Sequence, residues 1–431
     1  MNTTRRDFLR LAATAGVLSQ VDPFTSRLLA VSPPAPTDSA LVVIFLRGAA
    51  DAMNMIVPFG DPGYAALRPT IAGTIADGVV PLDKTFGLHP AMRSLKPIYD
   101  AGQFAPIVCA GSPHSTRSHF DAQDWMEFAA PGDRSMRDGW VNRYLEFTKP
   151  KKDNVSDFRA LGMQELLPRS LRGSYPVLAV PTSLGRRKTG KTLDRFERFY
   201  GDSGGMLEGG SSMDGRREED PAGVVASGRI TIETLRRFGE IIAVAEKKKK
   251  KAMRNNQTVS GSSYPTSKFA NRLKQIALVL RANEGLEVAG IDYGGWDDHT
   301  QEGGIEGRMA DRMTDFSKSL AAFCRDLGPQ LETTTILVMS EFGRTVRENG
   351  NSGTDHGHGS NMLILGGGVK GGKVHGDWRG LAEGSLYQGR DLAVTTDFRD
   401  VMHDVMGNAL GFDPPKGFFP GYTASKVRGL Y

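Results

Sequence analysis

The chain has 431 residues, which is enough for two or three small domains or for one large domain with insertions. Its formal net charge is +5, but five lysines stand together at 247–251, so the basic balance is local and gives little support for a nucleic-acid partner. The two cysteines are too few for a disulfide-built scaffold, and no stretch approaches the roughly 18 continuous apolar residues of a membrane-spanning helix. We therefore expect neither a nucleic-acid-binding protein nor an integral membrane protein.

The N-terminal residues resemble an export signal. Arg5 and Arg6 stand in the run TRRDFLR, and a short, alanine-rich apolar stretch follows at 11–18. This pattern is typical of the twin-arginine signal, and it favours export over the alternative, an amphipathic N-terminal helix. We expect residues 1–35 to be the signal region and the twin-arginine translocase to be a partner during export. The exported chain would then be periplasmic or otherwise extracytoplasmic.

Short apolar runs recur along the rest of the chain, and they are typical of strands that are buried on both faces of a sheet. They lie at 41–46, 104–110, 176–180, 288–291, 334–339 and 362–365. Longer segments with apolar residues at three- and four-residue spacing lie between most of these runs. They predict helices at 118–128, 227–245, 267–282, 306–327 and 397–410. This alternation predicts an α/β fold with a doubly wound, mostly parallel central sheet and helices on both faces.

We expect residues 36–431 to form a single domain with two interruptions. Residues 186–228 are polar and rich in glycine, which is typical of a long surface excursion or a mobile flap. Residues 247–263 begin with the five lysines. A solvated helix end or a disordered insert explains this second segment better than an anionic binding surface, because no aromatic residues alternate with its charges.

Ligands of an open α/β sheet bind beyond the carboxyl ends of the strands, so the residues that follow each predicted strand are the candidates for a site. Asp51 and Asn54 follow the first strand. Their carboxylate and amide suit a hard cation or a ligand hydroxyl, although a capped turn explains them equally well. Glu341 and Arg344 follow the strand expected at 334–339, and Glu341 is a candidate metal ligand or general base.

The run GSPHSTRSHFD leads from the second strand directly into a predicted helix. Hydroxyls of Thr116 and Ser118 at a helix N-terminus would stabilise an anionic nucleophile or a bound phosphate or sulfate, and Arg117 would clamp the same anion. Taken alone, Ser118 is better explained as an N-cap, with Asp121 completing a capping-box-like arrangement. The neighbouring His119 and Arg117 shift the interpretation toward a site.

Histidines in two loops indicate a metal site. Asp297 and His299 follow the strand expected at 288–291, and Asp-x-His spacing suits metal ligation. His356 and His358 lie in the run DHGHGS just before a strand, and neighbouring imidazoles in a glycine-rich loop are typical of metal binding. A lone loop histidine is usually structural, but these clusters together predict a divalent cation, Zn, Mg, Mn or Ca.

Several motifs occur in a fixed order along the chain: FLRGAAD, TRSHFDAQ, GWDDH, SEFGRT and DHGHG. Together with the export signal, they resemble an exported bacterial family catalogued as domain of unknown function 1501. That family is similar to the alkaline phosphatase and sulfatase superfamily, whose members share a metal-binding α/β fold and hydrolyse or transfer phosphate and sulfate esters. The resemblance implies an alkaline phosphatase-like fold and an exported hydrolase.

The resemblance also implies roles for single residues. Ser118 is similar to the nucleophile at the helix start, with Thr116 as the second candidate and His119 beside them. Arg117 would hold the ester oxygens together with the cation, and Arg344 would be a second anion clamp. The metal ligands implied are Asp51, Asp297, His299, His356 and His358.

One position departs from the pattern of the superfamily. An Asp-His pair normally follows a strand there, whereas this chain has Glu341 followed by Phe342. The alternative to an enzyme is therefore a non-catalytic envelope protein that keeps the fold and docks a polysaccharide or a partner protein. For an enzyme, we expect a small anionic ester or a polysaccharide as the substrate.

Overall fold

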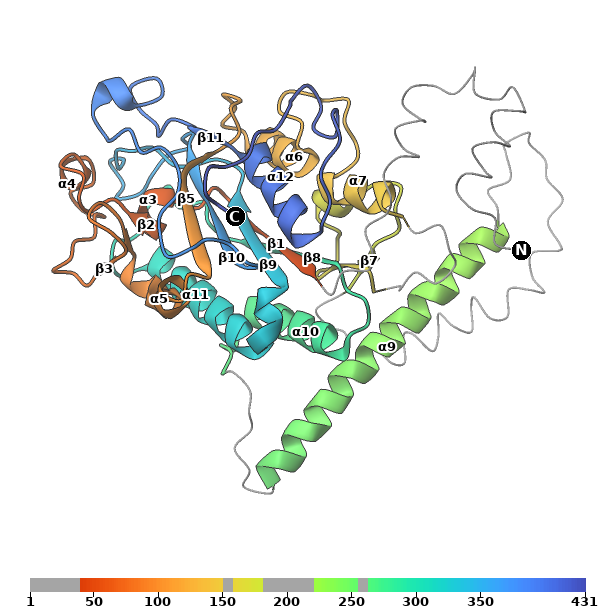
Figure 1. Ribbon diagram of the computed structural model, residues 1–431. Helices are drawn as coiled ribbons and strands as arrows, with labels where there is room; N and C mark the ends of the chain where they lie inside the picture. Colours follow the sequence, from red (N-terminus) through yellow and green to blue (C-terminus); the bar gives the residue numbers. More distant parts are fainter. Residues whose placement is uncertain (1–38, 150–157, 181–220, 255–262) are drawn as a thin grey trace, which may run out of the picture.

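The structure is a computed structural model, and it describes residues 39–149, 158–180, 221–254 and 263–431 (Figure 1). The predicted signal region at 1–35 and most of the predicted excursion at 186–228 lie outside these residues. A central sheet crosses the described part of the chain, and helices lie on either side of it in Figure 1. Among the residues described, no helix is both long enough and apolar enough to cross a membrane.

The sheet is made of β1 (Ala40–Arg47), β5 (Phe104–Gly111), β6 (Ala160–Gly162), β7 (Leu178–Ala179), β8 (Val288–Gly294), β9 (Thr334–Ser340), β10 (Ser360–Gly366) and β11 (Thr396–Asp397). Their order across the sheet is β11-β5-β10-β9-β1-β8-β6-β7. β1 pairs in parallel with β8 and β9, which places Ile44 opposite Ile291 and Val338. β10 runs antiparallel to both of its neighbours, β5 and β9. The sheet is therefore mostly parallel, as the sequence predicts.

The longer helices are α6 (His119–Phe128), α7 (Trp140–Phe147), α9 (Pro221–Arg254), α10 (Lys268–Ala282), α11 (Arg308–Leu327) and α12 (Phe398–Ala409). Side chains at the predicted start positions cap two of them, since Ser267 accepts a hydrogen bond from Ala270 N and Asp397 accepts one from Arg399 N. Four of the five predicted helices begin and end in the structure within about two residues of their predicted bounds. The helix α7 lies in a segment for which the sequence predicts none.

Both faces of the sheet are buried, which explains why its strands consist of continuous apolar runs. Val42 and Ile44 of β1 pack in one apolar cluster with side chains of α10 and α11. Val43 and Phe45 point to the other face, where they join a cluster with side chains of α6, α7 and α12. This confirms a doubly wound arrangement with helices on both faces.

A small antiparallel sheet lies beside the main one and is made of β2 (Ile56–Val57), β3 (Val80–Pro81) and β4 (Gly87–Leu88). The connecting segments contain the short helices α3 (Ala52–Met55), α4 (Tyr64–Leu67), η2 (Pro90–Leu95), α5 (Lys96–Asp100), η3 (Arg169–Leu171), η4 (Gly328–Glu332) and η5 (Glu383–Ser385). The sequence predicts none of these elements, because two to six residues are too few to show a periodic pattern.

The helix α9 is longer than its prediction of 227–245. It begins at Pro221 and ends at Arg254, so it includes the last residues of the predicted excursion and the run of five lysines. Phe238 is fully buried on the side that packs against α10, whereas Val244 is 54% exposed. Figure 1 shows α9 running along the outside of the molecule, with its C-terminal end projecting beyond α10.

The packing of α9 can be tested with two truncations on the same helix. Phe238→Ala removes a fully buried ring, and we expect it to lower the free energy of unfolding by about 3–5 kcal/mol. Val244→Ala truncates an exposed side chain, and we expect a change of at most about 0.5 kcal/mol. Urea unfolding followed by circular dichroism measures both. Equal effects from the two variants would contradict the observed packing of this helix.

Candidate metal centre

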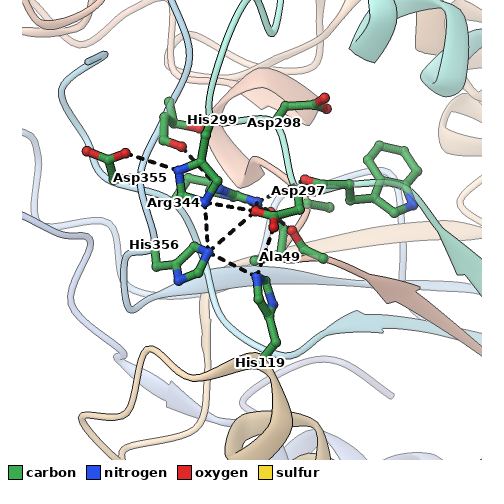
Figure 2. A network of polar contacts seen from close by, with 12 residues as sticks. Ala49, His119, Asp297, Asp298, His299, Arg344, Asp355 and His356 are labelled. Carbon is green, nitrogen blue, oxygen red and sulfur yellow. Dashed lines mark hydrogen bonds and ion pairs between the residues drawn. The ribbon is translucent and has the colours of Figure 1, made fainter. Parts of the chain in front are cut away.

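Three segments meet at the carboxyl-terminal edge of the sheet. His119 is the first residue of α6, Asp297 and His299 follow β8, and His356 precedes β10 (Figure 2). Because β10 runs antiparallel to its neighbours, the residues before it reach the same edge as the residues after the parallel strands. This reversal brings a late loop of the chain against the earlier ones.

The Nε2 atoms of the histidines converge with one carboxylate (Figure 2). His356 Nε2 lies 2.9 Å from His119 Nε2 and 2.9 Å from His299 Nε2. Asp297 Oδ1 is 3.0 Å from His299 Nε2, and Asp297 Oδ2 is 3.4 Å from His119 Nε2. The ligand atoms of His119, Asp297 and His356 all lie within 4.8 Å of one another, which is a grouping that can hold a metal ion.

The opposite nitrogen of each ring, Nδ1, is bound by the protein. His119 Nδ1 is 2.8 Å from Glu341 Oε1, and His299 Nδ1 is 3.1 Å from Asp355 Oδ1. His356 Nδ1 is 2.8 Å from the main-chain carbonyl oxygen of Arg117. A carbonyl oxygen and an ionised carboxylate only accept hydrogen bonds, so each Nδ1 must carry the hydrogen.

This assignment leaves a lone pair on each Nε2 of a neutral ring, and these lone pairs point toward one another. Such an arrangement is repulsive unless a positive charge lies between the nitrogens. The hydrogen bond to Glu341 raises the pKa of His119, whereas burial and the neighbouring His119 lower the pKa of His356. The two rings therefore do not both carry a proton readily.

Glu341 lies behind His119 and is fully buried. Its Oε1 accepts hydrogen bonds from Gly48 N at 2.8 Å, from Gln123 Nε2 at 2.9 Å and from His119 Nδ1. Burial opposes ionisation of Glu341, but the hydrogen bonds from His119 and Gln123 outweigh it and lower the pKa of this carboxyl. In this position Glu341 orients the ring of His119, and it does not face the point where the Nε2 atoms converge.

Arg344 holds Asp297 and the surrounding loops. Its guanidinium is buried, and Nη2 donates to Asp297 Oδ1 at 2.5 Å and to the carbonyl oxygen of Gly48 at 2.6 Å. The other nitrogens donate to the carbonyl oxygens of Ala49 and Thr354. Burial opposes ionisation of Asp297, but Arg344 outweighs it and lowers the pKa of this carboxyl. The protein therefore engages the guanidinium that the sequence predicts as a second anion clamp.

The start of α6 carries the predicted nucleophiles. Ser118 is the N-cap residue, but its side chain makes no capping hydrogen bond, and Asp121 pairs with Arg134 instead of completing a capping box. Thr116 Oγ1 accepts a hydrogen bond from Ser118 N at 3.2 Å. Both hydroxyls belong to the turn that leads directly into His119.

The side chain of Arg117 is held by a buried carboxylate. Its Nε and Nη2 atoms donate to Oδ2 of the fully buried Asp391 at 3.2 and 2.6 Å, and Nη2 also donates to Gln388. The first predicted anion clamp is thus engaged by a carboxylate, as is Arg344.

Two predicted metal ligands lie outside the cluster. His358 is buried and stacks on Tyr387 with ring centroids 4.0 Å apart, and burial followed by the charge of Arg117 lowers the pKa of His358 to about 4. Asp51 caps α3 and forms a buried ion pair with Arg68, which also donates to the carbonyl oxygen of Thr345. The sequence alone does not show this partner of Asp51.

A second buried carboxyl, Glu302, belongs to the same network as Asp51. It accepts hydrogen bonds from Asn54 Nδ2 at 2.9 Å and from Thr354 Oγ1 at 2.8 Å. Burial and the charge of Asp51 raise the pKa of Glu302 well above its ordinary value. Two carboxyls therefore face a single arginine, and one of them keeps its proton to a higher pH.

Glu302, Asp355 and Gln123 are not among the site residues that the sequence predicts. Asp355 stands next to His356 in the DHGHG motif, so its position beside a predicted ligand is an available signal. Gln123 lies four residues after His119, and this spacing places both on one face of α6. Glu302 shows no comparable pattern, because its partners lie far away along the chain.

Substitutions of the two buried carboxyls separate their roles. Asp51→Asn removes the carboxylate that forms the ion pair with the buried Arg68, and we expect it to lower the free energy of unfolding by about 3–5 kcal/mol. Glu302→Gln mimics the protonated acid, and we expect a loss below about 1 kcal/mol at pH 7. Both values come from urea unfolding, and metal content of the folded Asp51→Asn protein shows whether Asp51 is a ligand.

The pH dependence of the Glu302→Gln variant follows from the raised pKa. The folded protein holds this proton more tightly than the unfolded chain, whose Glu pKa is about 4.3, so the contribution of Glu302 to stability is complete below that pH. It is lost as the pH rises through the pKa of the folded state. The variant should therefore gain stability relative to the wild type as the pH rises above about 4, and a constant difference would contradict the raised pKa.

The fold and the geometry define an α/β protein with a histidine-rich centre at the carboxyl edge of its sheet. A family model described as "Protein of unknown function (DUF1501)" matches residues 235–416, which contain Asp297, His299 and His356. The match confirms the family resemblance that the sequence motifs predict. None of the curated proteins matches the chain.

Several solved structures are similar to this chain at low identity. A sulfatase from Pseudoalteromonas sp. is 11% identical with a TM-score of 0.35, over 89% of this chain and 71% of that chain. The C-terminal periplasmic domain of EcEptC from Escherichia coli, in complex with Zn, is 10% identical with a TM-score of 0.34, over 92% and 93%. A phosphonate monoester hydrolase from Silicibacter pomeroyi is 12% identical with a TM-score of 0.30, over 90% and 78%. These TM-scores are too low to carry an activity over to this chain.

Proposed function

We propose that the chain is an exported, metal-dependent hydrolase that acts on phosphate or sulfate esters. The observation that carries the proposal is the convergence of three histidine Nε2 atoms on the carboxylate of Asp297, with every Nδ1 bound from behind. Metal-ligating histidines have this arrangement, because the hydrogen bond at one nitrogen fixes the lone pair on the other. The ester class follows from the family resemblance, and the export route follows from the twin-arginine motif.

The donor set favours zinc among the divalent cations. Imidazole nitrogens suit zinc and other transition metals, whereas Mg²⁺ and Ca²⁺ prefer oxygen ligands. Two nitrogens on one tetrahedral zinc lie about 3.3 Å apart, given Zn–N bonds of about 2.0–2.1 Å. The separations of His356 and Asp297 from the other ligand atoms run from 2.9 to 3.4 Å, and His119, Asp297 and His356 form the close group, so His299 would have to move toward His119 to share one ion with it. His119, Asp297, His299 and His356 are the proposed ligands.

The surrounding residues would hold these ligands in place. Glu341 and Asp355 orient His119 and His299, and the carbonyl of Arg117 orients His356. Arg344 keeps Asp297 ionised and pointed at the nitrogens. Because its ligands are already oriented, such a centre needs little reorganisation free energy when a cation binds.

The attacking group in this proposal is a hydroxyl at the start of α6. Ser118 is the first candidate, because it adjoins His119 and makes no capping hydrogen bond, and Thr116 is the second. The helix N-terminus favours negative charge on such an oxygen. When bound, the metal would supply the positive charge that acidifies the hydroxyl and draws electrons from the ester.

A second candidate function is an envelope protein that binds a metal without hydrolysing an ester. The observation that favours it is the state of Arg117 and Arg344, because both guanidiniums are engaged by carboxylates of the protein. A purified protein that retains its metal but hydrolyses no phosphate or sulfate ester would support this function.

Separate substitutions of two nearby histidines, His356 and His358, test the metal centre. We expect His356→Gln to abolish stoichiometric zinc binding, because His356 Nε2 contacts both other rings. His358→Gln is the matched control, since His358 stacks on Tyr387 and should leave the zinc content unchanged. Elemental analysis of the purified proteins measures the metal, and a screen of phosphate and sulfate monoesters and diesters measures activity. Zinc retained in the first variant would contradict the proposed ligand set.

Substitution of Glu341 tests the support behind His119. Glu341→Gln keeps the shape of the side chain but removes the negative charge that orients the ring, so we expect zinc affinity to fall about 10- to 100-fold. Competition titration against a zinc-binding dye measures the change. An affinity equal to that of the wild type would show that His119 does not depend on this carboxylate.

A further inference from the structure

We propose that Arg390 is the residue that binds the anionic group of the substrate beside the metal centre. This inference rests on the proposed function, and it assigns the anion-binding role to a residue outside the sequence motifs. Both guanidiniums that the motifs suggest, Arg117 and Arg344, donate to carboxylates of the protein. Arg390 lies at the same site and its side chain is 43% exposed.

The segment at 387–391 brings Arg390 against the cluster. Arg390 Nη2 donates to the carbonyl oxygen of His356 at 2.6 Å, and the carbonyl oxygen of Arg390 accepts a hydrogen bond from Val346 N at 3.2 Å. Tyr387, at the other end of the segment, stacks on His358. Arg390 is therefore fixed next to a proposed metal ligand through both its main chain and its side chain.

Arg390 makes only a long contact with the carboxylate beside it. The fully buried Asp391 is the carboxylate between Arg117 and Arg390, and its Oδ2 is taken by Arg117. Its Oδ1 makes no hydrogen bond and lies 3.5 Å from Arg390 Nε, beyond a normal hydrogen-bond distance. Asp391 thus faces two guanidiniums but accepts hydrogen bonds only from Arg117.

Burial opposes ionisation of the nearby Asp355, but the hydrogen bonds from His299 and Asn349 and the charge of Arg390 lower its pKa, so this carboxylate balances part of the charge of Arg390 without a hydrogen bond to it. Its Oδ1 already faces His299 Nδ1 at 3.1 Å and Asn349 Nδ2 at 3.1 Å. The side chains of Asp297 and His299 are 44% and 41% exposed, so the centre opens to solvent as Arg390 does. A guanidinium fork matches two oxygens of a phosphate or sulfate group, which suits Arg390 to hold the group while the metal centre contacts another oxygen.

Binding of inorganic phosphate, measured by isothermal titration calorimetry on zinc-loaded protein, tests the proposal. We expect Arg390→Gln to raise the Kd for phosphate about tenfold or more, because charge-assisted hydrogen bonds are lost, while zinc content stays the same. Arg390→Lys keeps the charge without the fork and should have an intermediate Kd. Arg237→Gln is the matched control, since Arg237 is an exposed arginine of α9 that is paired with Glu284 and Glu240.

The same titration on metal-free protein separates this proposal from the proposed function. If the wild type takes up no zinc, the metal-dependent hydrolase fails, yet weaker phosphate binding that is lost in Arg390→Gln would still support Arg390. Phosphate binding through Arg390 without hydrolysis of any ester would support the anion site and sink the hydrolase. A Kd for Arg390→Gln equal to that of the wild type, or no phosphate binding by the wild type in either state, would overturn the proposal.

Discussion

The organisation of the site depends on one electrostatic constraint: three imidazole lone pairs are turned toward one another by acceptors behind each ring. Glu341, Asp355 and the carbonyl of Arg117 supply those acceptors, and none of them can give up a hydrogen to relieve the repulsion. The repulsion between these lone pairs is relieved by a positive charge among the nitrogens, and a metal cation of the right size would supply that charge.

This arrangement of the rings arises because the fold brings loops from distant parts of the chain into direct contact. Gly48, with φ of +114°, approaches the loop after β8 so closely that a Cβ atom would lie 2.6 Å from Asp297 N. Its amide donates to Glu341 and its carbonyl accepts from Arg344. The main chain of the loop after β1 thus holds Glu341 and Arg344, the two residues that orient His119 and Asp297. Asp51, a few residues on, stabilises the buried network around Arg68.

The sequence predicts the architecture well because its strands are buried on both faces and its longer helices are amphipathic. The predicted strand at 41–46 and the helix at 267–282 differ from β1 and α10 by one residue at most at either end. The site is predicted less completely, because the sequence pattern shows which loops meet but does not show which of their atoms come into contact. His119 follows Ser118 in the sequence, yet only the structure shows its Nε2 beside His356. Likewise, no local sequence pattern indicates that Arg68 will form an ion pair with Asp51.

The central prediction is that a metal binds where the histidine Nε2 atoms meet the carboxylate of Asp297. X-ray absorption spectroscopy at the zinc edge of zinc-loaded protein tests this. The account predicts imidazole nitrogens and one carboxylate oxygen at about 2.0–2.2 Å around a single tightly held zinc. Protein that holds no zinc, or zinc whose ligands include no imidazole, would contradict it.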